Sequence, residues 1–290
     1  MTSRSMEEGW LTGADGNRLA FRRFEAAGGH PVLLLHGGGQ SGRAWWRAAE
    51  WLAARGHASF IFDQRGHGDS EWLESGRYAL DDFKDDLDLA LEHWGRPCVL
   101  VGSSLGGLVS LLSTGNGHRL ISGLVLVDTA PQLNEAEVHR LIRFLSGGGA
   151  EGFDSPEAAA EHMRAFFPER PVKTASVMAG LFQDPAGRWR WRWDLRMILG
   201  ERNSVGLPHQ DRMHELAKKI AVPVLLLRAG RSDLVSDAAV ERLKRCTPQL
   251  ELDLLEDSDH IVGGADGEMI MERILPFIER CGRQRAGGGA

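Results

Sequence analysis

Short, mainly apolar runs recur along the chain, and segments with helical spacing of apolar residues separate them. The runs lie at residues 32–35, 59–62, 98–101, 124–127, 224–227 and 250–255. Strands that are apolar throughout are buried on both faces, which is typical of a parallel sheet covered by helices. Helical patterns over residues 45–55, 80–94 and 268–280 alternate with these runs. The pattern therefore predicts the α/β class.

Two parts of the chain depart from this rhythm. Residues 10–12 and 18–24 flank a turn of Gly, Asp and Asn residues and predict an opening hairpin. Residues 131–219 contain no clear apolar strand and predict several short helices, one of them with Ser155 as N-cap and Pro156 as first residue. We therefore expect an α/β core of residues 1–130 and 220–282, a helical cap of residues 131–219, and a flexible tail of residues 283–290.

The composition indicates which partners and which cellular compartment to expect for this protein. A chain of 290 residues with 42% hydrophobic residues is large enough for one sizeable α/β domain. The net charge of −6 argues against a nucleic-acid binder. The three cysteines are far apart and suggest neither a disulfide framework nor a metal site, and no apolar run approaches the roughly 20 residues of a membrane span. We expect a cytoplasmic monomer or homodimer with a small-molecule substrate and no metal, cofactor, nucleic-acid or membrane partner.

The sequence Gly102-Ser103-Ser104-Leu105-Gly106 carries the most chemistry. It reads G-x-S-x-G and lies between a strand pattern and a helix pattern. A serine on such a tight turn is exposed, and the helix that follows points free N–H groups toward it. A glycine-rich turn with no chemistry is the alternative for the motif by itself.

With four further motifs, the chain resembles the α/β-hydrolase superfamily over nearly its whole length. The motifs are His36-Gly37-Gly38-Gly39, residues 63–70 with the sequence DQRGHGDS, residues 102–107, Gly230-Arg231-Ser232-Asp233, and Asp259-His260. The resemblance implies a mostly parallel eight-stranded sheet with helices on both faces and an inserted helical cap. It implies that Asp63 and the residues after it hold loops and are not catalytic.

The resemblance also implies a catalytic triad. Ser104 would be the nucleophile, and His260, the one histidine beyond the last strand pattern, would be its base. Asp233, about 27 residues before His260, would be the acid that orients the imidazole. Asp128, at the end of the preceding strand, is the alternative acid, because some members of the superfamily place it there.

The resemblance suggests the remaining site residues. The N–H groups of Leu105 and Gly38 would form the oxyanion hole. The insertion is rich in large apolar side chains that either pack a helical layer or line an apolar pocket. Those expected to bind substrate, together with Gly39 beside the oxyanion loop, are Phe166, Phe167, Phe182, Trp191 and Trp193.

A serine at the nucleophile position favours acyl transfer to water. We expect a serine hydrolase that cleaves an ester, lactone or related acyl bond of a bulky apolar small molecule through an acyl-enzyme. The alternatives are a C–C bond hydrolase or a cofactor-independent, non-hydrolytic member of the fold such as a lyase, perhydrolase or dioxygenase. A ligand-binding module whose cap closes over a hormone-like molecule is a weaker alternative.

Overall fold

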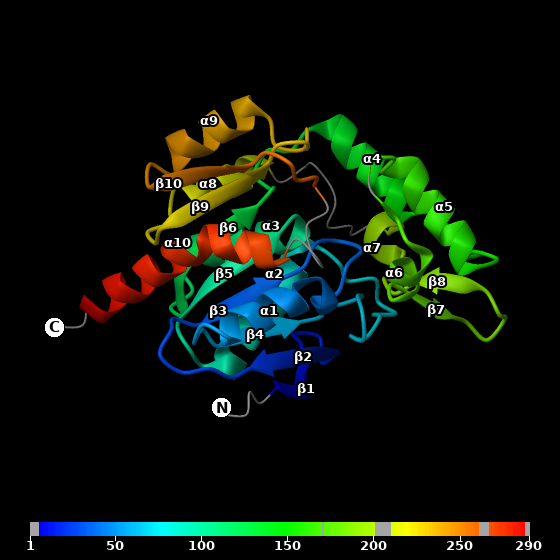
Figure 1. Ribbon diagram of the computed structural model, residues 1–290, viewed down its shortest axis with the longest axis horizontal. Coiled ribbons are helices and arrows are strands. Elements are labelled where there is room, and N and C mark those ends of the chain that lie inside the picture. Colours follow the sequence, from blue (N-terminus) through cyan, green and yellow to red (C-terminus); the bar gives the residue numbers. More distant parts are fainter. Residues whose placement is uncertain (1–5, 170, 201–209, 261–266, 288–290) are drawn as a thin grey trace.

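The computed structural model describes residues 6–169, 171–200, 210–260 and 267–287 (Figure 1). Eight strands of this described part form one sheet in the order β1-β2-β4-β3-β5-β6-β9-β10. Their bounds are β1 Met6–Thr12, β2 Arg18–Phe24, β3 Val32–Leu35, β4 Ser59–Phe62, β5 Cys98–Ser103, β6 Ile121–Val127, β9 Val224–Ala229 and β10 Leu250–Leu255. Only β2 pairs antiparallel, with β1 and β4, which confirms the predicted mostly parallel sheet and the opening hairpin.

Helices cover both faces of the sheet, as the apolar runs predicted. Alternate residues of one strand belong to different cores: Leu33 packs in one core and Leu34 in the other. The first core lies under α2 (Leu80–Trp94) and α3 (Leu105–Gly115), and the second under α1 (Trp46–Ala53) and α10 (Gly267–Gly287). Because the central strands β3, β4, β5 and β6 are buried along their whole length, the polar side chains of the site lie at the strand ends.

The segment between β6 and β9 contains the cap, which lies to the right of the sheet in Figure 1. Its helices are α4 (Glu135–Leu145), α5 (Pro156–Phe166), α6 (Thr174–Met178) and α7 (Arg196–Leu199). The Ser155 hydroxyl caps α5, as predicted, by accepting from the Ala158 N–H at 3.2 Å. The cap is mainly helical, and it also contains an antiparallel hairpin of β7 (Leu181–Gln183) and β8 (Trp189–Trp191), which was not predicted.

The predicted boundaries at residues 219 and 283 also need correction. Helix α8 (Gln210–Ala217) packs against α3 and against α9 (Asp237–Cys246), so it belongs with the helices of the core. Helix α10 continues through Gly287 where a tail was expected from residue 283, while residues 288–290 lie outside the described part. No helix among the described residues has both the length and the apolar character needed to cross a membrane.

The loop that follows β4 is held to the core by a buried ion pair. The Arg65 guanidinium donates to both carboxylate oxygens of Asp86 on α2, at 2.6 and 2.8 Å, and both side chains are almost fully buried. Arg65 also donates to Asp15 in the first hairpin turn at 2.8 Å. Asp63 accepts from the N–H groups of Gly42 and Asp69, at 2.6 and 2.8 Å. These contacts agree with the loop-holding role that the resemblance implied for this motif.

The same loop fastens the cap to the core. The N–H of Gly68 donates to the carbonyl of Arg192 at 2.7 Å, and the N–H of Asp194 donates to the carbonyl of Gly66 at 2.8 Å. The Tyr78 hydroxyl donates to Asp194 at 2.7 Å, which satisfies a buried carboxylate at the cap. Residues 192–194 are therefore fixed against the core, next to the carboxyl ends of the strands.

We expect Asp86→Ala to destabilise the protein by about 3 kcal/mol, because it leaves the buried Arg65 charge without its main partner. Urea denaturation measures the change in the free energy of unfolding. Asp85→Ala is the matched control, since Asp85 lies next in sequence with half of its side chain exposed, and its effect should stay within about 0.5 kcal/mol. Equal effects of the two substitutions would contradict this account of Arg65.

Candidate active site

Ser104 occupies a strained turn between β5 and α3. Its φ of 50° and ψ of −118° lie outside the regions that side chains ordinarily favour. The turn needs glycine on both sides of the serine: a Cβ on Gly102 would lie 2.4 Å from the carbonyl oxygen of Gly106, and a Cβ on Gly106 would lie 2.6 Å from that of His36. The G-x-S-x-G pattern is therefore a packing requirement, and the resulting turn presents the serine to a cavity.

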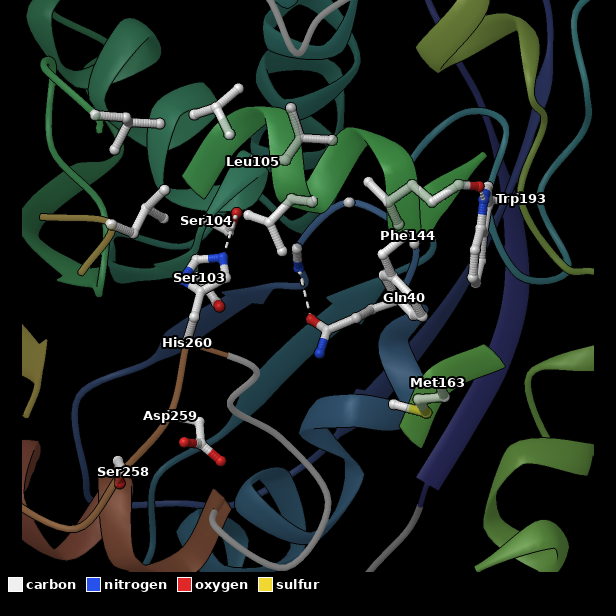
Figure 2. Close-up of a pocket in the computed structure, with 18 of the residues that line it drawn as sticks. Gln40, Ser103, Ser104, Leu105, Phe144, Met163, Trp193, Ser258, Asp259 and His260 are labelled. Atoms are coloured by element: carbon white, nitrogen blue, oxygen red, sulfur yellow. Dashed lines mark hydrogen bonds between the residues drawn. The ribbon is translucent and has the colours of Figure 1, made fainter. Parts of the chain in front are cut away.

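His260 links Ser104 to a buried carboxylate. Its Nε2 lies 3.2 Å from the Ser104 hydroxyl oxygen (Figure 2), and its Nδ1 lies 2.9 Å from Oδ2 of Asp128. Because the carboxylate can only accept, Nδ1 carries the proton and Nε2 is left to accept from the serine hydroxyl. This is the order of contacts that a serine nucleophile with a general base requires.

The structure assigns the acid position to Asp128, so the prediction of Asp233 is wrong. Asp233 lies on the exposed loop after β9 and makes no hydrogen bond or ion pair with any described residue. Asp128 directly follows β6, the neighbour of β5, and is fully buried. Its φ of 46° and the Ala229 N–H, which donates to Oδ1 at 3.1 Å, aim its second oxygen at His260. Both aspartates follow strand ends in sequence, and only the order of strands in the sheet separates them.

The loop after β3 passes beside the serine. A Cβ on Gly37 would lie 3.2 Å from Cβ of Ser104. The N–H groups of Gly37 and Gly39 donate to Gln40 Oε1 at 2.9 Å and to His67 Nε2 at 3.2 Å, whereas that of Gly38 meets no acceptor among the described residues. Figure 2 shows the contact of Gln40 with this loop.

Leu105 is the second predicted oxyanion donor and the first residue of α3. The N–H of a first helical residue has no acceptor inside its own helix. Both Gly38 and Leu105 line the same cavity as Ser104. The geometry is compatible with the predicted oxyanion hole, which stays a prediction. Gln40 was not among the predicted site residues, although its position directly after the triple glycine was the available signal.

Two buried histidines support this loop in their neutral form. The rings of His36 and His67 meet edge to face, with centroids 5.0 Å apart. Burial lowers the pKa of His36 to about 4. Burial, and secondarily the neighbouring His36, lower the pKa of His67 to about 3, although Asp63 and Asp194 act in the opposite direction. The neutral His67 can therefore accept from the Gly39 N–H, with its own Nδ1 donating to the Arg65 carbonyl at 2.9 Å.

A cavity of about 820 Å³ lies between the serine turn and the cap. Of the predicted substrate-binding residues, Gly39, Trp191 and Trp193 line it, and Phe166, Phe167 and Phe182 do not. Phe166 and Phe167 pack on Phe144 inside the cap, with ring centroids 5.8 and 4.9 Å from its ring. These two side chains therefore pack the helical layer of the cap, which was the alternative stated for the cap aromatics, and do not line the pocket.

Phe182 packs against Trp72, with ring centroids 5.7 Å apart, and is half-buried. Helix α4 supplies part of the cavity wall, and Val138, Leu141 and Leu145 are among its residues that line the cavity. Their helical spacing of three and four residues was the available signal. In the described part of the chain, histidine, cysteine and acidic side chains form no cluster suited to a metal ion.

The model of the Alpha/beta hydrolase family matches residues 32–270. The chain is 28% identical to the esterase Rv0045c of Mycobacterium tuberculosis over 260 residues, which cover 86% of this chain and 82% of that protein. It is 29% identical to the lipase LipV of the same organism over 255 residues, or 84% of this chain and 91% of that protein. The fold of this chain matches the crystal structure of an alpha/beta hydrolase from Novosphingobium aromaticivorans with a TM-score of 0.77. The two sequences are 24% identical, and the match covers 94% of this chain and 99% of that one.

We expect the free energy of unfolding to fall as the pH drops from about 6.5 toward 4. In the unfolded chain His36 and His67 take up protons near pH 6.5, whereas the folded protein keeps them neutral, so acid favours unfolding. At pH 5 each histidine should contribute a loss of about 2 kcal/mol relative to neutral pH. Urea denaturation between pH 5 and 7.5 measures this dependence.

The contribution of His67 is isolated by His67→Gln, whose amide oxygen can still accept from Gly39. This variant should lose less stability on acidification than the wild-type protein, by about 2 kcal/mol at pH 5. His139→Gln, at an exposed position on α4, should keep the wild-type pH dependence. A wild-type pH dependence in His67→Gln would show that His67 is not held neutral.

Proposed function

Because the chain belongs to the alpha/beta hydrolase family, we propose that it is a serine hydrolase that cleaves an ester or related acyl bond of an apolar small molecule. The observation that carries the proposal is the hydrogen-bonded row Ser104–His260–Asp128 at the wall of a large, mainly apolar cavity. The esterase and the lipase to which the chain is similar support the same reaction class.

The first half of the reaction forms an acyl-enzyme. Ser104 Oγ attacks the acyl carbon while its proton passes to Nε2 of His260. The Asp128 carboxylate stabilises the resulting imidazolium through Nδ1–H and does not itself take the proton. The N–H groups of Gly38 and Leu105 would receive the developing oxyanion, and the N-terminus of α3 adds a favourable dipole. When the tetrahedral intermediate collapses, His260 returns the proton to the leaving oxygen.

The second half repeats these steps with water. His260 takes a proton from a water molecule, whose oxygen attacks the acyl carbon of the Ser104 ester. Collapse of the second tetrahedral intermediate breaks the bond to Ser104 Oγ, and His260 returns the proton to that oxygen. The carboxylic acid leaves, and each catalytic group is restored to its starting protonation state.

Ser104→Ala should lower kcat/KM for p-nitrophenyl esters by at least about 10⁴-fold, because the bond-forming atom is removed. A fluorophosphonate probe should form a covalent adduct on Ser104 in the wild-type protein, detected by peptide mass spectrometry, and none in the variant. Ester turnover that persists in Ser104→Ala would overturn the assignment. A wild-type protein that forms no adduct and hydrolyses no ester would instead favour a non-hydrolytic reaction of the same fold.

Asp128→Asn should lower kcat by about 10³- to 10⁴-fold with little change in KM. The asparagine oxygen would keep the hydrogen bond from Ala229, which turns the amide N–H₂ toward His260 and forces the proton onto Nε2. A histidine with its proton on Nε2 cannot accept from Ser104. Asp233→Asn is the matched control, because that side chain is exposed, and its kcat should remain within about twofold of wild type. A larger loss in Asp233→Asn than in Asp128→Asn would reverse the assignment of the acid.

A further inference from the structure

Two tryptophans of the cap form a rigid partition between two cavities. The indole rings of Trp191 and Trp193 are stacked, with centroids 4.6 Å apart and planes at 9°. Both rings are buried, and a hydrogen bond from the ring N–H holds each of them. The Trp191 N–H donates to the carbonyl of Gly147 at 3.1 Å, and the Trp193 N–H donates to the carbonyl of Leu145 at 3.0 Å. Neither ring can turn without losing its hydrogen bond, which is partly buried for Trp191 and buried for Trp193.

Behind the pair lies a second cavity of about 90 Å³. Trp191 and Trp193 are the only described residues that line both this space and the active-site cavity. The other walls of the second cavity come from Trp72, Phe153, the glycines of the loop after α4, and residues 190, 194 and 195. The stacked indoles therefore separate the active-site cavity from additional space inside the cap.

The position of His260 decides which part of a substrate points toward this partition. His260 must give its proton to the leaving group, so that group lies on the His260 side of Ser104. Asp257, Ser258 and Asp259 precede His260 in the cavity wall, and Arg231 pairs with Asp257 at 2.7 Å. Other polar side chains of the wall are Gln40, Glu169, Lys173, Ser176 and Gln210. Figure 2 shows Trp193 and Phe144 at the opposite end of the cavity from His260. An acyl chain, bonded to the same carbon as the leaving group, would have room to extend toward the end that Phe144 and Trp193 line.

We propose that the stacked pair is the end wall of the acyl pocket and that Trp191 sets the longest acyl chain the enzyme accepts. The inference rests on the proposed function and adds the substrate class, an ester with an apolar acyl chain of limited length and a more polar leaving group. Trp191 is the residue that decides length, because it also packs on Phe153 of the second cavity, with ring centroids 5.4 Å apart. Trp193 lies against Gly39 and so also supports the oxyanion loop.

The test compares kcat/KM for p-nitrophenyl esters with acyl chains from C4 to C16. In Trp191→Ala the active-site cavity should join the second cavity, and each further methylene that becomes buried should raise kcat/KM by about fourfold. We expect the ratio of dodecanoate to hexanoate hydrolysis to rise at least about tenfold over wild type. Trp191→Phe removes less volume and should disturb the fold less. It should raise the same ratio of dodecanoate to hexanoate hydrolysis, by a smaller factor.

Trp189→Ala is the matched control. Trp189 lies on the same strand, is half-buried, and lines neither cavity, so its chain-length profile should parallel that of wild type. A series of acetate esters with alcohols of increasing length should also be unaffected in all three variants. A shift in the alcohol series instead of the acyl series would overturn the direction assigned to the acyl chain.

Labelling of Ser104 by alkyl fluorophosphonates of increasing chain length separates the two levels of the proposal. Faster labelling of Trp191→Ala by the long-chain probes supports the inference independently of turnover. An unchanged acyl profile in Trp191→Ala and Trp191→Phe, with an active wild-type enzyme, overturns the inference and leaves the serine hydrolase proposal intact. A wild-type protein that neither hydrolyses esters nor reacts with the probes overturns both.

Discussion

Close backbone packing around Ser104 is the constraint on which the rest of the site depends. The end of β5, the start of α3 and the loop after β3 approach so closely that no side chain fits at Gly102 or Gly106. This packing forces the positive φ of Ser104 and points its hydroxyl out of the sheet edge. It also sets the start of α3 beside the oxyanion loop. A single requirement for small residues therefore positions the nucleophile and both predicted oxyanion donors together.

The loop after β4 connects the loop after β3 to the cap through hydrogen bonds. Arg65 and Asp63 fix the loop internally, and His67 accepts from the Gly39 N–H. The backbone of the same loop pairs with residues 192–194. The loop after β3 and the segment around Trp193 are thus held by one short segment that carries no proposed catalytic group. Burial keeps His67 neutral, and only the neutral ring can accept this hydrogen bond.

The sequence patterns were sufficient for the sheet, the nucleophile turn and the histidine. Uninterrupted apolar runs predicted strands covered on both faces, and β3, β5, β6 and β9 have that burial. They were insufficient for the cap, where the hairpin of β7 and β8 replaces part of the predicted helical layer. Arginines alternate with the tryptophans there, and Arg190 and Arg192 pair with Asp184 and Asp69. A strand in which apolar and charged residues alternate has no continuous apolar run, so the pattern of such runs does not predict it.

The sequence by itself determined which chemical groups are available: a serine in a glycine-rich turn, one histidine after the last strand, and aspartates at strand ends. These are local features, and local backbone sterics and burial are enough to specify them. Only the tertiary structure decided between Asp128 and Asp233, because the choice depends on β6 lying next to β5 and on the buried N–H of Ala229. The tertiary structure likewise decided which cap aromatics face the cavity. Phe167 and Trp191 are both large aromatic residues that are buried to nearly the same extent, and only packing between distant segments distinguishes a core side chain from a cavity wall.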